Sequence, residues 1–134
     1  MKLGIVVSEW YWEELTSHML DRALEAAENE HVKTEVVRVS GSFDIPLAVK
    51  LLLKKKSIDG VVALGAIVQG ATGHDLAIAN ATYCSLTQLS LEFEKPVALG
   101  ITGPRMTMAQ AIKRIPHAKL VTEACIDMVR SLKK

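Results

Sequence analysis

Short apolar runs of strand length alternate with longer amphipathic segments along the whole of this chain. The runs lie at residues 3–7, 32–39, 58–66 and 96–101. The first is continuously apolar and the third is the most hydrophobic, as expected for strands that are covered on both faces. The second alternates in part and is rich in β-branched residues, which predicts a strand nearer a sheet edge. The pattern therefore favours parallel strands joined by helices.

Helical patterns follow each of the four runs. They occupy residues 12–30, 43–54, roughly 74–93, a segment from residue 107 and a segment after residue 116. In the first, Leu15, Met19 and Ala23 recur every four residues, which is typical of an amphipathic helix. Right-handed crossovers limit this order to a doubly wound sheet. We expect an α/β protein with a three-layer flavodoxin-like fold, a four-stranded parallel sheet with helices on both faces, in one domain over residues 1–134.

Two of these helices begin with a capping-box pattern, in which two side chains three residues apart satisfy backbone N–H groups at the helix start. Thr72 followed by Asp75 predicts the start of the third helix, and Thr107 followed by Gln110 predicts the start of the fourth. Pro46 falls in the first turn of the second helix, where its missing N–H is tolerated.

Charge and composition exclude several classes of protein. The 134 residues include 16 Lys and Arg against 15 Asp and Glu, and this net charge of +1 supplies no field for binding a nucleic acid. No apolar run reaches the ~18 residues of a membrane span, and Met1 leads into a strand without the segments of a secretory leader. We expect a cytoplasmic protein without nucleic-acid or membrane partners. Cys84 and Cys125 stand apart on helical segments, which predicts reduced, buried thiols.

The most informative segment is a glycine-rich loop at residues 65–75. It follows a strand, and doubly wound folds bind ligands at the carboxyl ends of their strands. It also leads into a helix N-terminus, whose free N–H groups attract anions, so a phosphate or carboxylate at Ala71 and Thr72 is physically sensible. The same pattern is explained if Thr72 only caps its helix. The loop matches neither the Walker motif nor the dinucleotide-binding motif. His74 is the one histidine expected at this cleft and is the candidate acid or base.

Aromatic and basic residues supply further candidates. Three of the six aromatic residues are consecutive, at positions 10–12, and cannot all face one way. We assign Trp10 to the cleft, where an aromatic ring can stack on a planar heterocycle, and Trp12 to packing. Near the last two helices stands a basic set: Arg105, Lys113, Arg114 and Lys119. Most such charges are only solvated, and an arginine that pairs with phosphate is the minority case.

Two segments resemble the lumazine synthase family of riboflavin biosynthesis. Residues 41–46, Gly-Ser-Phe-Asp-Ile-Pro, are similar to its G-A-F-E-x-P motif, and residues 64–74, Leu-Gly-Ala-Ile-Val-Gln-Gly-Ala-Thr-Gly-His, are similar to its L-G-x-V-I-x-G-x-T-x-H motif. Residues 99–102 and 110–114 match the family more weakly. The resemblance covers the whole chain in order. The resemblance implies a transferase that condenses 5-amino-6-(D-ribitylamino)uracil with 3,4-dihydroxy-2-butanone 4-phosphate. Its products are 6,7-dimethyl-8-ribityllumazine, phosphate and water.

The resemblance also implies roles for individual residues. His74 is the matched acid/base residue, and Trp10 is matched to stacking on the pyrimidine. The matched substrate-binding positions are Ser42, Phe43, Asp44, Ala66, Ile67 and Val68 for the pyrimidine with its ribityl chain, Ala71, Thr72, Arg114 and Lys119 for the phosphate, and Leu99 for an apolar wall. The family commonly has Phe at the position of Trp10 and Glu at that of Asp44. Proton transfer and positioning suffice for such a condensation, so we expect no cofactor and no metal.

Members of this family form pentamers, and many assemble pentamers into a hollow shell. The resemblance therefore implies a homo-oligomer in which Leu99 and Arg114 come from the subunit opposite Trp10 and His74. Two alternatives stay open, an archaeal-type riboflavin synthase and a non-catalytic flavin-binding cage protein. A phosphate-binding loop argues against the first, because the dismutation of two lumazines has no phosphate substrate.

Overall fold

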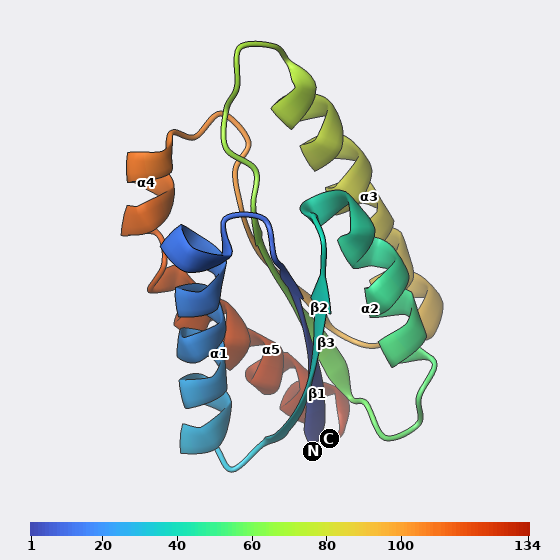
Figure 1. Ribbon diagram of the computed structural model, residues 1–134. Helices are drawn as coiled ribbons and strands as arrows, with labels where there is room; N and C mark the ends of the chain where they lie inside the picture. Colours follow the sequence, from blue (N-terminus) through green and yellow to red (C-terminus); the bar gives the residue numbers. More distant parts are fainter.

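Four parallel strands form the centre of the structure, in the order β2-β1-β3-β4. The structure is a computed structural model that describes residues 1–134. In chain order the elements are β1 (Lys2–Ser8), a π-helical turn η1 (Trp12–Thr16), α1 (Ser17–Asn29), β2 (Lys33–Val39), a 3-10 turn η2 (Ser42–Asp44), α2 (Ile45–Leu53), β3 (Gly60–Ala66), α3 (His74–Phe93), β4 (Val97–Thr102), α4 (Met108–Lys113) and α5 (His117–Leu132). Figure 1 shows α1 and α5 on one face of the sheet and α2 and α3 on the other. The predicted three-layer α/β fold is confirmed.

Strand order explains how deeply each strand is buried. β1 and β3 lie at the centre, where Ile5 pairs with Val36 on one side and with Val62 on the other. Every residue of β3 is buried, whereas β2 lies at an edge and has no fully buried residue. The partial alternation of residues 32–39 therefore predicted the position of this strand correctly.

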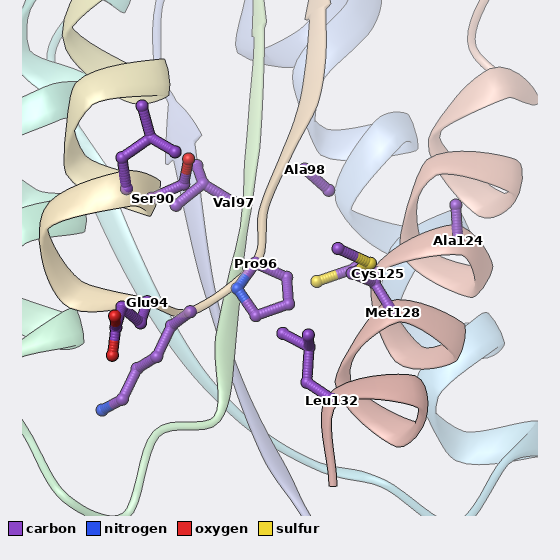
Figure 2. Close-up of a pocket in the computed structure, with 11 residues that line it drawn as sticks. Ser90, Glu94, Pro96, Val97, Ala98, Ala124, Cys125, Met128 and Leu132 are labelled. Carbon is purple, nitrogen blue, oxygen red and sulfur yellow. The ribbon is translucent and has the colours of Figure 1, made fainter. Parts of the chain in front are cut away.

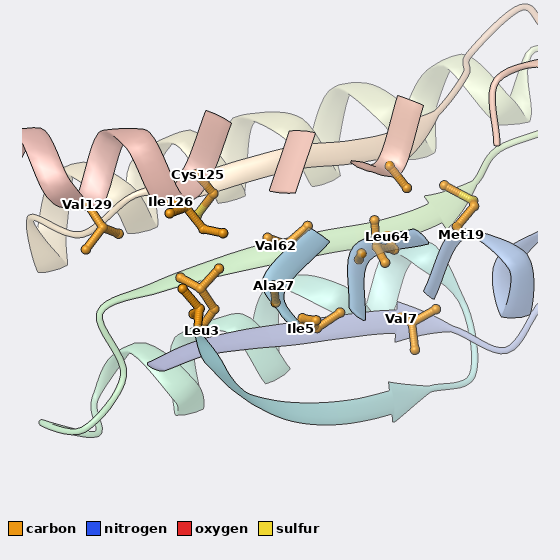
Figure 3. Close-up of a cluster of buried hydrophobic side chains, with 13 residues drawn as sticks. Leu3, Ile5, Val7, Met19, Ala27, Val62, Leu64, Cys125, Ile126 and Val129 are labelled. Carbon is orange, nitrogen blue, oxygen red and sulfur yellow. The ribbon is translucent and has the colours of Figure 1, made fainter. Parts of the chain in front are cut away.

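Apolar side chains of the central strands fill the space between the sheet and both helix layers. Leu3, Ile5 and Val7 of β1 point toward α1 and α5, where they join a buried cluster with Met19 and Ile126 (Figure 3). Each such side chain stabilises the fold by about 1.5–3 kcal/mol when fully buried. A second buried cluster joins the opposite face to α2 and α3. This packing holds the strands rigidly and so fixes the loops at their carboxyl ends.

One of the two predicted capping boxes forms. At α4, the Thr107 hydroxyl accepts a hydrogen bond from the Gln110 N–H at 3.2 Å, and the Gln110 side chain accepts one from the Thr107 N–H at 2.9 Å. The capping box predicted at Thr72 is wrong, because Gly73 is the N-cap residue and the Thr72 hydroxyl accepts from the His74 N–H, at 3.3 Å, rather than from that of Asp75. The Asp75 carboxylate instead faces the protein interior.

The two cysteines differ in environment. Cys125 is buried, as predicted, and burial raises the pKa of its thiol to about 12. Cys84 is exposed, so the prediction of two buried thiols is wrong for this residue. It lies on a part of α3 that faces away from the sheet. No helix combines the length and the apolar character needed to cross a membrane.

Candidate functional site

A cleft of about 420 Å³ opens at the carboxyl ends of β1 and β3. It is formed by the loop after β1, the turn after β2, the end of β3 with its loop, and the first turns of α3. Most of the predicted site residues line it: Trp10, Ser42, Phe43, Ala66, Ile67, Val68, Thr72 and His74. Two segments far apart in the sequence, residues 41–43 and 66–74, therefore meet at one place.

Aromatic rings form one wall of the cleft. Trp10 is 63% exposed and Phe43 is 67% exposed, so both present apolar surface to solvent in the free chain. Tyr11 also lines the cleft, and its ring meets that of Trp10 edge to face, with centroids 6.2 Å apart. Trp12 packs against the core as predicted, with the Arg38 guanidinium 3.6 Å above its ring. The exposed rings offer a surface on which a planar ligand can stack.

Polar groups lie behind this wall. The Ser42 hydroxyl is buried and has no hydrogen-bond partner within the chain. Asp44, although predicted as a site residue, does not line the cleft, because its carboxylate accepts a hydrogen bond from the Gly41 N–H at 3.1 Å. Asp44 therefore shapes the turn that presents Ser42 and Phe43.

The glycine-rich loop forms the opposite side of the cleft. Gly70, Thr72 and His74 line it, whereas Ala71 does not. The His74 N–H donates to the Thr72 hydroxyl at 3.3 Å, and Gly73 at the N-cap position has no side chain. The next N–H groups of the first turn have no intrahelical partner, which leaves donors for an anion at this helix end. A Cβ atom on Gly70 would meet nothing within 4 Å, so no packing within this chain demands glycine there. The open space around the loop is consistent with a ligand that lies close to its backbone.

Two further residues line the cleft: Asp75, which the sequence suggested as a helix-capping residue beside His74, and Ile78, which sequence reasoning missed. Asp75 is 4% exposed, and its Oδ2 accepts a hydrogen bond from the Arg105 N–H at 3.0 Å. Ile78 lies one helical turn after His74, so the helical period itself was the available signal.

Three predicted site residues lie away from the cleft of their own chain. Leu99 is on the edge strand β4 and is 47% exposed, Arg114 is exposed at the end of α4, and Lys119 is half-buried on α5. No lysine or arginine lines the cleft. The single chain thus joins the aromatic wall and His74, and it does not bring the predicted phosphate cations to them.

A larger pocket, of about 710 Å³, lies at the amino end of β4 between the end of α3 and α5. Figure 2 shows its mainly apolar lining, which includes Pro96, Cys125, Met128 and Leu132. None of the predicted site residues lines it. Its polar lining residues, Ser90, Glu94 and Lys95, lie outside the segments 41–46 and 64–74. We therefore place the candidate site in the smaller cleft, which these two segments line.

The residues around the smaller cleft agree with a known family. The sequence profile of the 6,7-dimethyl-8-ribityllumazine synthases matches residues 1–133. The chain belongs to the lumazine synthase family. Both motifs that resemble this family, at residues 41–46 and 64–74, contribute to the cleft.

Individual relatives are similar over nearly their whole length. The lumazine synthase of Methanopyrus kandleri is 45% identical over 100% of this chain and 95% of its own. That of Picrophilus torridus is 45% identical over 99% and 98%, and that of Methanobrevibacter smithii is 46% identical over 94% and 91%. Among solved structures, a lipoprotein fragment from Peptoclostridium difficile 630 superposes with a TM-score of 0.53 at 15% identity, over 95% of this chain and 98% of that one. This last likeness concerns the fold alone.

Proposed function

We propose that this protein is a 6,7-dimethyl-8-ribityllumazine synthase, a transferase that condenses 5-amino-6-(D-ribitylamino)uracil with 3,4-dihydroxy-2-butanone 4-phosphate. The observation that carries the proposal is that the two family motifs, distant in sequence, meet around one cleft beside His74. Residues 1–134 act in this proposal as one domain, and the enzyme works in the cytoplasm.

The pyrimidine is expected to bind against the aromatic wall. Trp10 stacks on the ring, and Phe43 covers it from the turn after β2. The unpartnered hydroxyl of Ser42 and the backbone around Ala66 to Val68 supply polar partners for the ring edge and the ribityl chain. Such a site combines an apolar wall with a few placed polar groups, as small-molecule sites generally do.

The phosphorylated substrate is expected to bind at the start of α3. The N–H groups of the first turn that follow His74 and the O–H of Thr72 are donors for a phosphate, which must be held and then released. His74 lines the same cleft as Trp10 and Phe43, and in this proposal it moves protons during imine formation and phosphate elimination. Holding both substrates side by side converts a bimolecular reaction into one within a single complex.

A complete site requires a second copy of the chain. Leu99, Arg114 and Lys119 do not reach the cleft of their own chain, so in this proposal a neighbouring copy supplies the apolar wall and the phosphate cations. Exposed apolar side chains near β4 and on α5, among them Leu91, Leu99 and Met128, support packing between copies. The assembly that we propose is a pentamer or a pentamer-based shell.

The proposal is tested by mixing the purified protein with both substrates and following lumazine absorbance, beside a mass measurement in solution. Lumazine formation with phosphate release by a homo-oligomer is the expected result. Riboflavin formed from added lumazine, without lumazine synthesis, would instead identify an archaeal-type riboflavin synthase. Tight flavin binding without any turnover would identify a cage protein.

A further inference from the structure

Asp75 occupies a position where an apolar side chain would be the ordinary choice. The buried residues of α3 recur as Asp75, Ala79, Thr82, Leu86 and Leu89, the spacing of a helix face that packs against a core. Asp75 is the first residue of this buried face. Its Oδ1 is closed to solvent and has no hydrogen-bond partner. A buried carboxylate oxygen without a partner costs stability, so packing alone does not account for the aspartate.

The other oxygen of this carboxylate makes a contact that ties two segments together. Oδ2 accepts a hydrogen bond from the Arg105 N–H at 3.0 Å, across 30 residues of sequence. Arg105 has a φ of 59°, in the left-handed region that disfavours side chains other than glycine. The hydrogen bond therefore helps to hold a costly backbone conformation in the loop between β4 and α4.

Around the candidate site, this contact is the main anchor of the start of α3. Residues 71–74, 76 and 77 are all exposed, so Asp75 is the only buried residue of this stretch. Gly73 at the N-cap position supplies no cap, and the Thr72 hydroxyl makes only an exposed 3.3 Å hydrogen bond with the His74 N–H. Successive residues of a helix differ by about 100° in direction, so holding Asp75 inward keeps the first turn in line with the buried face of α3 and thereby sets the direction of His74.

We propose that Asp75 is a positioning residue, which fixes His74 over the cleft by tying the first turn of α3 to the loop after β4. The inference rests on the proposed function, in which His74 is the acid/base residue. Asp75 itself acts through His74, because its Oδ2 is engaged with the backbone of Arg105 and its Oδ1 is closed to solvent. A small displacement of a reacting group is enough to lower a rate by about 100-fold.

Two substitutions at Asp75 separate positioning from folding. Asp75→Asn keeps an oxygen that accepts from the Arg105 N–H, and we expect it to retain most of the wild-type kcat. Asp75→Leu continues the apolar face of α3 and removes the hydrogen bond to the Arg105 N–H. We expect it to stay folded, to lower kcat by about 10- to 100-fold, and to leave the KM for the pyrimidine nearly unchanged.

Tyr83→Phe is the matched control. The Tyr83 hydroxyl donates to the Gly103 carbonyl oxygen at 2.6 Å, so it joins α3 to the same loop two turns beyond Asp75. Its loss is expected to lower the melting temperature and to leave kcat near the wild-type value. If Asp75→Leu and Tyr83→Phe lowered kcat equally and in proportion to stability, Asp75 would have only a structural role and the inference would be wrong.

Amide hydrogen exchange tests the Asp75–Arg105 hydrogen bond without reference to turnover. In Asp75→Leu the Arg105 amide, which loses its acceptor, and the first bonded amides of α3 at residues 77–79 are expected to exchange faster while those of β1 and β3 stay protected. Asp75→Asn should match the wild type. Unchanged exchange at Arg105 and residues 77–79 would overturn the inference even if the enzyme is active. A wild-type protein that makes no lumazine, with the expected exchange pattern, would overturn the catalytic part together with the proposed function.

Discussion

The hydroxyl oxygen of Ser42 lies 2.8 Å from the point that a Cβ atom on Gly65 would occupy. Ser42 opens the turn after β2, and Gly65 lies near the end of the central strand β3. The missing side chain of Gly65 therefore makes the space in which the buried Ser42 hydroxyl stands on the cleft wall. A core glycine in one motif thus determines the place of a candidate substrate-binding group in the other.

Gly65→Ala is expected to destabilise the protein and to weaken pyrimidine binding. The added methyl group must displace Ser42 or shift the strand, at a cost of about 1–3 kcal/mol in the free energy of unfolding. Urea unfolding measures this cost. Gly70→Ala is the control for stability, because its Cβ atom would meet nothing within 4 Å. Adding Ser42→Ala to Gly65→Ala should restore part of the lost stability, since the close contact is then removed.

Replacing His74 by alanine is expected to lower kcat by about 10²–10⁴-fold, the contribution of a positioned acid/base group. The side chain is exposed at the start of α3, so the folded state should persist. Initial rates of lumazine formation give the comparison, with His18→Ala on the exposed face of α1 as the control. Equal rates for the two variants would remove His74 from the chemistry.

Arg114→Ala is expected to raise mainly the KM for the phosphorylated substrate, because a guanidinium pairs with phosphate through two hydrogen bonds. Arg114→Lys should recover part of the affinity through its charge alone. If the cation comes from a neighbouring copy, mixed oligomers of His74→Ala and Arg114→Ala chains contain some sites with both residues intact. The activity of such co-expressed mixtures should therefore exceed that of either variant alone. An activity no higher than the mean of the two variants would contradict a shared site.

Trp10→Ala is expected to weaken binding of the pyrimidine and to spare the phosphorylated substrate. Stacking contributes about 0.5–1.5 kcal/mol beyond the apolar area that is buried. Trp10→Phe keeps a stacking ring and should lie close to the wild type. Separate KM values for the two substrates provide the measurement. Equal losses for both substrates would indicate a general disturbance of the site.

Stability is expected to fall between pH 9 and 12. Burial raises the pKa of the Cys125 thiol from 9.0 to about 12, and burial likewise raises the pKa of Tyr83 from 10.0 to about 12. The unfolded chain thus loses these protons first, so the unfolded state is increasingly favoured as the pH rises through this window. The slope for Cys125 reaches at most about 1.4 kcal/mol per pH unit, and the partly exposed Tyr83 adds less.

Cys125→Ala tests whether the buried thiol causes this loss of stability at alkaline pH. It should lower stability at neutral pH through a small cavity and should flatten the decline above pH 9. Cys84→Ala removes the exposed thiol and serves as the control. An equally steep decline in Cys125→Ala would assign the loss to other groups.

Much of the fold could be predicted because its signals are local. The runs at residues 3–7 and 58–66 became the two central strands, and the alternation of residues 32–39 indicated an edge strand. The capping box at Thr107 formed because its partner, Gln110, lies within the same turn. At Thr72 the same pattern was wrong, since a distant partner, the N–H of Arg105, takes the carboxylate of Asp75.

The sequence by itself determined the order of strands and helices, the family motifs and the edge of the sheet at which a ligand should bind. These features could be read from the sequence because each depends on residues that are close together along the chain. Only the tertiary structure decided that Ser42 stands against Gly65, that Asp75 turns inward, that Cys84 is exposed and that Arg114 lies outside its own chain's cleft. Such contacts join residues far apart in sequence, and the packing of helices on the twisted sheet, rather than any local pattern, brings them together or keeps them apart.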